Sequence, residues 1–240
     1  MVASSHTQTA ADPEALAEAA ARWVAERALA AGPRFALVLS GGSTPKRLYQ
    51  LLAAPPWRDR LPWPRIHLFW GDERFVPPDH PDSNFGMARR ALLDQVPLPP
   101  GNLHPMRTDG TPALAAAAYE QELKAFYGAA ALDPARPLFD VTLLGLGPDG
   151  HTASLFPGNP ALEERRAWCV AVVGARPEPR LTLTLPALES SRAVAFLVEG
   201  AGKRDILGRI RGGEDLPAQR VRPAGELWWL IDKAAEPVLG

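Results

Sequence analysis

The sequence has little cysteine, almost no net charge and no long apolar run. Cys169 is the one cysteine among 240 residues, so the chain carries no disulfide framework. A formal net charge of -1 argues against a protein that binds nucleic acid mainly through phosphate contacts. No segment approaches the roughly 20 apolar residues of a membrane span, and the polar residues 1–12 contain no signal-peptide core. We therefore expect no nucleic-acid partner, no membrane partner and a cytoplasmic protein.

The composition is the ordinary mixture of a globular protein, with 46% hydrophobic and 22% charged residues. A chain of this length buries a sizeable core without help from disulfides or metals. It contains no internal repeat, low-complexity linker or clear domain boundary. The prediction is a single domain over residues 1–240, in which residues 1–11 form a flexible N-terminal tail.

Short apolar runs and amphipathic segments alternate along most of the chain. Asp12 is a suitable N-cap for the first helix, which has proline in its first position. Because helices separate the strands, crossover connections and a mostly parallel sheet follow. We expect a three-layer α/β fold with helices on both faces of the sheet. Strands are predicted over residues 35–39, 65–70, 139–144, 168–173, 181–185, 192–198 and 226–232, and helices over residues 13–31, 46–54, 85–93, 112–130 and 202–211.

Three loops follow predicted strands, at residues 40–45, 71–74 and 145–158. Open α/β sheets bind ligands beyond the carboxyl ends of their strands. The first loop, Ser-Gly-Gly-Ser-Thr-Pro, offers an anion its backbone N–H groups, a helix N-terminus and the hydroxyls of Ser43 and Thr44. The alternative is a plain turn with a helix cap. ATP is not supported, because the Gly-Lys-Ser/Thr ending of a Walker loop is missing.

The third loop begins with Gly145-Leu-Gly-Pro-Asp-Gly, which has the glycine spacing of a dinucleotide-binding fingerprint. That fingerprint requires a long helix directly after it and an acidic residue at the end of the next strand. Pro157 and Gly158 interrupt the helix, and Gly174 and Ala175 follow the next strand. The match therefore fails in its context.

His151 lies in the same glycine-rich loop, in Asp149-Gly-His151. Imidazole suits general acid–base chemistry near neutral pH, because its reference pKa is about 6.5. Asp149 or Asp72 could orient its ring. The alternative is a histidine satisfied by loop carbonyls, which is our interpretation of the other histidines. These are His6, His67, His80 and His104.

Basic side chains also stand near predicted strand ends. Arg74 follows a strand, Arg180 precedes one, and Lys203 lies at a helix start. Arginine can bind a phosphate through two hydrogen bonds, and lysine acts as a compact charge. Each residue alone is typical of a solvated surface. Together, on one side of a sheet, they form a candidate phosphate site.

The sequence offers no pattern for a metal site or a covalent nucleophile. No cysteine or histidine pair has ligand spacing, so no metal is expected. Cys169 lies in an apolar run that is typical of a buried core thiol. Ser43 and Ser154 lack the Gly-x-Ser-x-Gly elbow of serine hydrolases.

Taken together, several segments resemble one known family. From about residue 14 to 232, in order and spacing, the chain resembles the glucosamine-6-phosphate isomerase/6-phosphogluconolactonase family, and in particular its lactonases. The block Asp-Gly-His-Thr-Ala-Ser-Leu-Phe-Pro-Gly, residues 149–158, is the most specific part. The segments that carry the resemblance are residues 40–45, 72–74, 83–84, 145–158, 179–184 and 198–203.

The resemblance implies a Rossmann-like α/β sandwich that hydrolyses 6-phospho-D-glucono-1,5-lactone to 6-phosphogluconate, the second step of the oxidative pentose phosphate pathway. No cofactor is implied, and the partner is a small phosphorylated lactone. His151 would be the general base, with Asp72 or Asp149 orienting it. Loop N–H groups near Gly147, or a basic side chain, would stabilise the oxyanion. We expect a monomer or weak homodimer. The phosphate and sugar hydroxyls would be bound by Gly41, Gly42, Ser43, Thr44, Arg74, Asn84, Arg180 and Lys203.

Two other functions are compatible with parts of this pattern. Glucosamine-6-phosphate isomerases normally continue the Asp-Gly-His block toward an Asn-Glu-Pro ending, which supplies an acidic group. Residues 152–157 here contain no carboxylate, which places that function second. A sugar-phosphate sensor on the same fold would keep the phosphate loop without needing His151.

Overall fold

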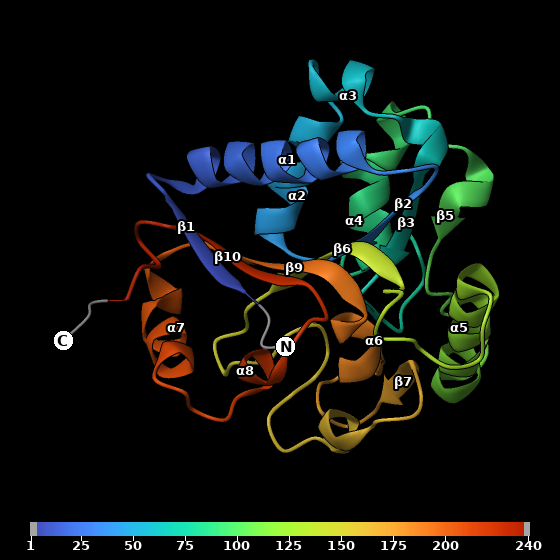
Figure 1. Ribbon diagram of the computed structural model, residues 1–240. Coiled ribbons are helices and arrows are strands. Elements are labelled where there is room, and N and C mark those ends of the chain that lie inside the picture. The colour runs from blue at the N-terminus through green and yellow to red at the C-terminus, as the bar shows by residue number, and fades with distance from the viewer. Residues whose placement is uncertain (1–3, 238–240) are drawn as a thin grey trace.

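Seven parallel strands form the central sheet of the protein, whose computed structural model describes residues 4–237. Helices α1 (Pro13–Ala30), α2 (Ser43–Leu52) and α4 (Asn84–Ala91) lie on one side of the sheet, and α6 (Leu185–Glu189) and α7 (Arg204–Arg211) lie on the other (Figure 1). The predicted three-layer α/β fold is confirmed. The strand order is β1 (Ser5–Ala10), β10 (Glu226–Asp232), β9 (Ser191–Val198), β6 (Phe139–Gly145), β2 (Phe35–Leu39), β3 (Ile66–Trp70) and β5 (Leu103–His104). The remaining α-helices of the described residues are α3 (Trp57–Arg60), α5 (Pro112–Tyr127) and α8 (Pro217–Arg220).

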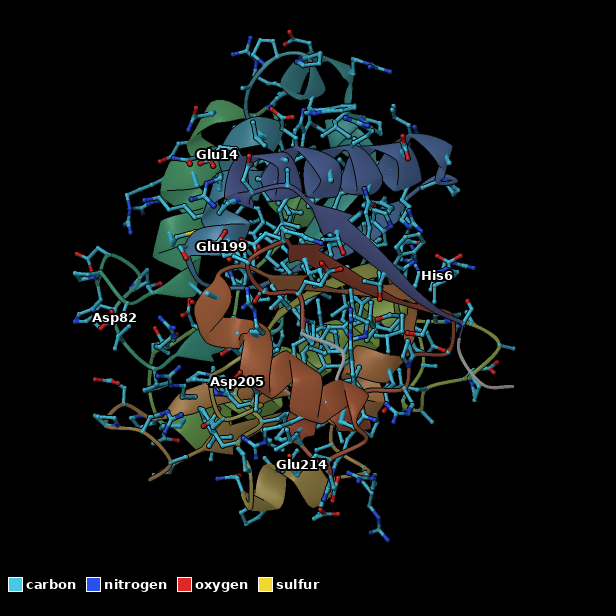
Figure 2. All side chains as sticks on the ribbon, turned by 90° about the vertical axis from the view of Figure 1, so that its left-hand side faces the viewer. His6, Glu14, Asp82, Glu199, Asp205 and Glu214 are labelled. Carbon is cyan, nitrogen blue, oxygen red and sulfur yellow. The ribbon has the colours of Figure 1, made fainter. Side chains whose placement is uncertain are left out.

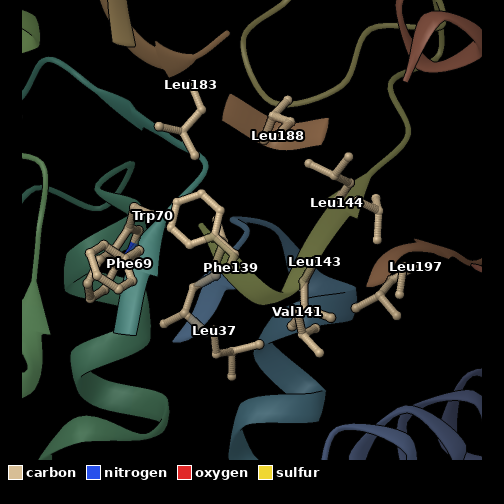
Figure 3. Packing of buried hydrophobic residues seen from close by; sticks show 14 of the residues in the cluster. Leu37, Phe69, Trp70, Phe139, Val141, Leu143, Leu144, Leu183, Leu188 and Leu197 are labelled. Atoms are coloured by element: carbon tan, nitrogen blue, oxygen red, sulfur yellow. The ribbon is translucent and has the colours of Figure 1, made fainter. Parts of the chain in front are cut away.

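The middle strands are apolar on both faces because helices cover both. All five residues of β2 are buried, and Leu37 pairs in register with Val141 of β6. Leu37, Val141 and Leu143 lie together in the core in Figure 3. Burying one such side chain contributes about 2 kcal/mol. This packing fixes the carboxyl ends of β2 and β6, from which the glycine-rich loops emerge.

Helix α1 begins as the sequence predicts. The Asp12 carboxylate accepts a hydrogen bond of 2.8 Å from the backbone N–H of Ala15, and Pro13 occupies the first helical position. The cap satisfies an N–H that the helix itself leaves unpaired. The helix ends at Ala30, and Gly32-Pro33 turns the chain into β2.

The prediction of a flexible tail over residues 1–11 is wrong for Ser5–Ala10, which form the edge strand β1. This strand pairs in parallel with β10 along its whole length. His6 stacks on Trp228 with ring centroids 4.5 Å apart. The side chains of β1 are mostly polar and largely exposed. Backbone hydrogen bonds therefore hold this strand, and its sequence shows no apolar pattern that would predict it. Residues 1–3 of the predicted tail lie outside the described residues.

A second, antiparallel sheet lies beside the first. Two of its strands were predicted, over residues 168–173 and 181–185, but not that they form a separate sheet. It consists of β4 (Asp72–Arg74), β8 (Arg180–Leu183) and β7 (Cys169–Val172), in that order. Residues 71–74 were predicted as a loop, because a strand of three residues is too short to show an alternation of apolar and polar side chains. Its register pairs Arg74 with Arg180. The small sheet therefore brings together two predicted site residues that are far apart in sequence.

Helices long and apolar enough to cross a membrane are absent from residues 4–237.

Candidate active site

A cavity of about 240 Å³ opens at the carboxyl ends of β2, β3 and β6. All three predicted loops contribute to its lining, as expected for an open α/β sheet. Ser43, Thr44 and Asp149 are not part of the lining. The predicted site residues that line the cavity are Gly41, Gly42, Asp72, Arg74, Asn84, Gly147, His151, Arg180 and Lys203.

The N-terminus of α2 forms one wall of the cavity. Gly42 is the N-cap and has a φ of 107°, which favours glycine. No side chain caps this helix, so N–H groups of its first turn are available to an anion. A Cβ at Gly41 would lie 1.9 Å from Oδ1 of Asn84. Glycine at this position is therefore what allows Asn84 to reach the loop.

The hydroxyl of Ser43 is directed elsewhere. Ser43 Oγ donates a hydrogen bond of 3.4 Å to Glu199, which Arg47 also binds at 2.8 Å. Glu199 lies beside the start of α2 in Figure 2. Ser43 and Thr44 can therefore contribute backbone N–H groups from the helix start, whereas the structure does not bring their side chains into the lining.

His151 is held in a tight turn of the third loop. The N–H of Gly147 donates to the carbonyl of His151 at 2.8 Å, and the N–H of Gly150 donates to the carbonyl of Gly147 at 3.1 Å. His151 Nδ1 contacts Asp149 Oδ1. A carboxylate acceptor requires Nδ1 to carry the proton, so the neutral ring has its lone pair on Nε2. That nitrogen can act as a base toward the cavity.

Asp149 has a second partner that sequence reasoning missed. Its Oδ2 accepts a hydrogen bond of 3.0 Å from Arg176, which lies in the loop between β7 and β8. Partial burial raises the pKa of Asp149, but hydrogen bonds from His151 and Arg176 outweigh burial and leave the pKa below its ordinary value. Asp149 is therefore a carboxylate at neutral pH. The one available signal was that Arg176 shortly precedes Arg180, a predicted site residue, in the sequence.

Asp72 does not orient the imidazole in the described contacts. Its Oδ2 accepts from Ser154 Oγ at 2.7 Å, and its Oδ1 accepts from Asn84 Nδ2 at 3.3 Å. Of the two carboxylates considered for that role, Asp149 is the one in contact with His151. Asp72 instead fixes Asn84 and the loop around Ser154, while still lining the cavity.

The cavity is rich in positive charge. Burial, and after it the charge of Arg74, lowers the pKa of Arg180. The Nε atoms of Arg74 and Arg180 are buried without a hydrogen-bond partner. Burial also lowers the pKa of Lys203, against the opposing charge of Asp149. Guanidinium groups facing one another in a cavity favour an anion between them.

The other four histidines lie outside this cavity and have partners of their own. His104 contacts Glu122 at 2.8 Å and His67 at 3.1 Å. His6 contacts Ser4, and His80 accepts from the N–H of Asp82. Within residues 4–237, no group of three or more histidine, cysteine or acidic residues could hold a metal ion.

Glu73 does not line the cavity but positions the start of α4. Its buried carboxylate accepts from the N–H groups of Asn84 and Phe85, both at 2.7 Å, and from Ser83 Oγ at 3.2 Å. Burial raises the pKa of Glu73 from 4.5 to about 7, although backbone N–H groups lower it. The carboxylate therefore costs folding energy when ionised, even as it holds Asn84 at the cavity.

This shift gives a pH-dependent stability. Because the folded-state pKa is raised, the extra stability is present below about pH 4.5 and is lost as pH rises through about 7. Between pH 5 and 8, the free energy of unfolding should fall by about 2 kcal/mol relative to a Glu73→Gln variant. Urea unfolding of both proteins at four pH values measures this difference. If the free energy of unfolding changed with pH in the same way in both proteins, the raised pKa of Glu73 would be contradicted.

The fold and the cavity define an α/β protein with a cavity lined by two arginines and a lysine, beside a histidine in contact with a carboxylate. Comparison with known proteins names the family. The family described as glucosamine-6-phosphate isomerases/6-phosphogluconolactonase matches residues 11–229. This chain belongs to that family, as the sequence resemblance predicts.

Individual relatives agree with this assignment. A 6-phosphogluconolactonase from a Nostoc species is 48% identical over 208 residues, which cover 84% of this chain and 83% of the relative. One from a Synechocystis species is 48% identical over 214 residues, covering 87% and 86%. The crystal structure of 6-phosphogluconolactonase from Thermotoga maritima superposes with a TM-score of 0.82 at 30% identity, covering 95% of this chain and 100% of that one.

Proposed function

We propose that the protein hydrolyses 6-phospho-D-glucono-1,5-lactone to 6-phospho-D-gluconate, the second step of the oxidative pentose phosphate pathway. The observation that carries this proposal is the His151–Asp149 pair beside a cavity rich in arginine and lysine. The named relatives are lactonases, which supports the same reaction here. The substrate is a small molecule whose phosphate matches the cationic cavity and whose lactone carbonyl matches a general base.

In the proposed reaction, His151 Nε2 takes a proton from a water molecule as the water oxygen attacks the lactone carbonyl carbon. The tetrahedral intermediate then breaks its bond to the ring oxygen, which receives a proton from the imidazolium. Asp149 supports the positive ring between the two steps. Phosphate binding by Arg74, Arg180 and the start of α2 supplies remote binding energy that fixes the carbonyl beside His151.

The oxyanion donor is assigned to Lys203 rather than to Gly147. The N–H of Gly147 already donates to the carbonyl of His151, which makes it unavailable to an oxyanion. Lys203 Nζ donates to the carbonyl of Leu146 at 2.6 Å. An ammonium group has three donors, so two stay available beside the His151 loop. In a cyclic ester the leaving oxygen stays attached to the product, so a base and an oxyanion donor are enough for this reaction. That the protein needs no cofactor stays a prediction.

The second candidate is a glucosamine-6-phosphate isomerase on the same fold. Residues 152–157 offer that reaction no carboxylate. Thr152 Oγ1 instead donates to the carbonyl of Gly145 at 2.9 Å, and Ser154 donates to Asp72. A non-catalytic sensor is the third candidate, and it would have no use for the His151–Asp149 pair. The His151–Asp149 pair favours an enzyme over the sensor, and the missing carboxylate favours the lactonase over the isomerase.

The test is proton release at constant pH after addition of freshly generated lactone, measured against the uncatalysed rate. We expect acceleration with the lactone and no ammonia or fructose 6-phosphate from glucosamine 6-phosphate. Activity on the amino sugar alone would favour the isomerase. Tight binding of 6-phosphogluconate with neither activity would favour the sensor.

A methyl group at Gly147 should disable this site without unfolding the protein. A Cβ there would lie 1.9 Å from His151 Nδ1 and 2.1 Å from its Cε1. The imidazole must move, so kcat of Gly147→Ala should fall about a hundredfold, with an unchanged circular dichroism spectrum. Gly145→Ala is the matched control, because its Cβ would meet only Ser40 Oγ at 3.8 Å. Equal activity of both variants would contradict the placement of His151.

A further inference from the structure

Arg176 contacts two neighbours of His151 but lies outside the cavity lining. Its Nη2 donates to Asp149 Oδ2 at 3.0 Å. Its guanidinium carbon lies 4.5 Å from the ring centroid of Phe156. The Phe156 ring in turn packs against the His151 ring with centroids 4.8 Å apart. One side chain thus contacts both the carboxylate and the aromatic ring that border the imidazole.

We propose that Arg176 is a positioning residue that fixes the imidazole of His151 by holding Asp149 and Phe156 together. The inference rests on the proposed role of His151 as the general base. It assigns to the β7–β8 loop, residues 173–179, a task in catalysis without contact to substrate.

The geometry explains why a second partner matters to Asp149. A carboxylate bound through one oxygen can rotate about its side-chain bond, and the geometry of its hydrogen bond with Nδ1 of His151 then varies. Arg176 occupies Oδ2 while His151 occupies Oδ1, so the carboxylate plane is fixed. The planar guanidinium also stacks on Phe156, which a lysine ammonium does not reproduce. Phe156 is buried and therefore provides a firm backing.

Charge adds a second effect that can be measured. Hydrogen bonds from His151 and Arg176 lower the pKa of Asp149, and the negative charge of Asp149 in turn raises the pKa of Lys203 against the effect of burial. The positive charge of Arg176 also contributes to the lowered pKa of Arg180. Removing the Arg176 charge leaves the Asp149 carboxylate more fully available to an imidazolium ring. The acid limb of the kcat/KM profile should therefore move to higher pH.

A structural role alone predicts something different. Arg176 and Asp149 side chains are 40% and 38% exposed, and an exposed ion pair contributes little to stability. If the pair only anchored the loop, its loss would leave the pH profile unchanged. Arg192 and Asp140 form a similar pair at 3.1 Å at the other end of the sheet, which makes Arg192→Gln a matched control.

The experiment compares pH profiles of wild type, Arg176→Met, Arg176→Lys and Arg192→Gln with the lactone. We expect Arg176→Met to lower kcat ten- to a hundredfold, with KM changed less than about twofold and the acid limb at higher pH. Arg176→Lys should restore the limb and only part of kcat. Arg192→Gln should match wild type.

The outcome separates this inference from the function on which it rests. His151→Gln is measured in the same series. If His151→Gln is inactive while both Arg176 variants match wild type, the positioning role is wrong and the proposed function stands. If His151→Gln keeps full activity, the base assignment fails first. A loss confined to KM would also overturn the inference, since it would place Arg176 in substrate binding.

Discussion

Replacing His151 with alanine should lower kcat about 10²- to 10⁴-fold, the usual contribution of a general base. Binding of 6-phosphogluconate should change little, because the arginines and the start of α2 are untouched. The imidazole is bordered by Asp149 and Phe156 and has no other side-chain partner among the described contacts. Its removal therefore deletes the base and leaves the cavity walls in place.

Steady-state kinetics and calorimetric titration with product measure the two halves of this prediction. His6→Ala, on the edge strand far along the sheet from the cavity, is the control and should match wild type. Loss of product binding by His151→Ala would mean that the histidine binds substrate. Full retained turnover would remove it from the reaction.

Replacing Arg180 with methionine should weaken binding of 6-phosphogluconate about ten- to a hundredfold, the worth of a hydrogen bond to a charged group. Methionine retains the apolar stem, which limits the loss of packing. Arg180 contributes a half-buried guanidinium beside Arg74, and no carboxylate pairs with it among the salt bridges of the described residues. Repulsion between the two arginines is relieved when a phosphate binds.

The same repulsion gives this prediction a second consequence. In the free protein, Arg180→Met should be neutral or stabilising, because one of two like charges is gone. Arg192→Gln serves again as the control for loss of an arginine outside the cavity. A product affinity equal to wild type would remove Arg180 from the site, and a large loss of stability would mean that it is structural.

The sequence predicts the middle of the central sheet well because the strands there are buried on both faces. The predicted ranges 35–39 and 226–232 are those of β2 and β10. Continuous apolar runs carry that signal even without neighbours. The edge strands β1 and β5 and the short strand β4 were missed, because backbone pairing holds them and their side chains are polar or few.

The site was predictable where loops follow strands and harder where contacts cross the fold. Gly41, His151 and Lys203 stand at strand ends or helix starts, and the fold brings them into one cavity. Arg176 escaped because its partner, Asp149, is 27 residues away in sequence. Loop N–H groups near Gly147 were one of two predicted kinds of oxyanion donor, beside a basic side chain, yet the N–H of Gly147 itself closes the turn that carries His151. Which N–H groups stay free depends on turn geometry, which composition does not reveal.

The most direct test of the account is a crystal structure of the protein with 6-phosphogluconate bound. We expect the carboxylate of the product, which marks the former lactone carbonyl, within about 3.5 Å of His151 Nε2. Its phosphate should lie against Arg180 and the N-terminus of α2. A product bound with its phosphate on His151, or bound outside this cavity, would contradict the proposed reaction.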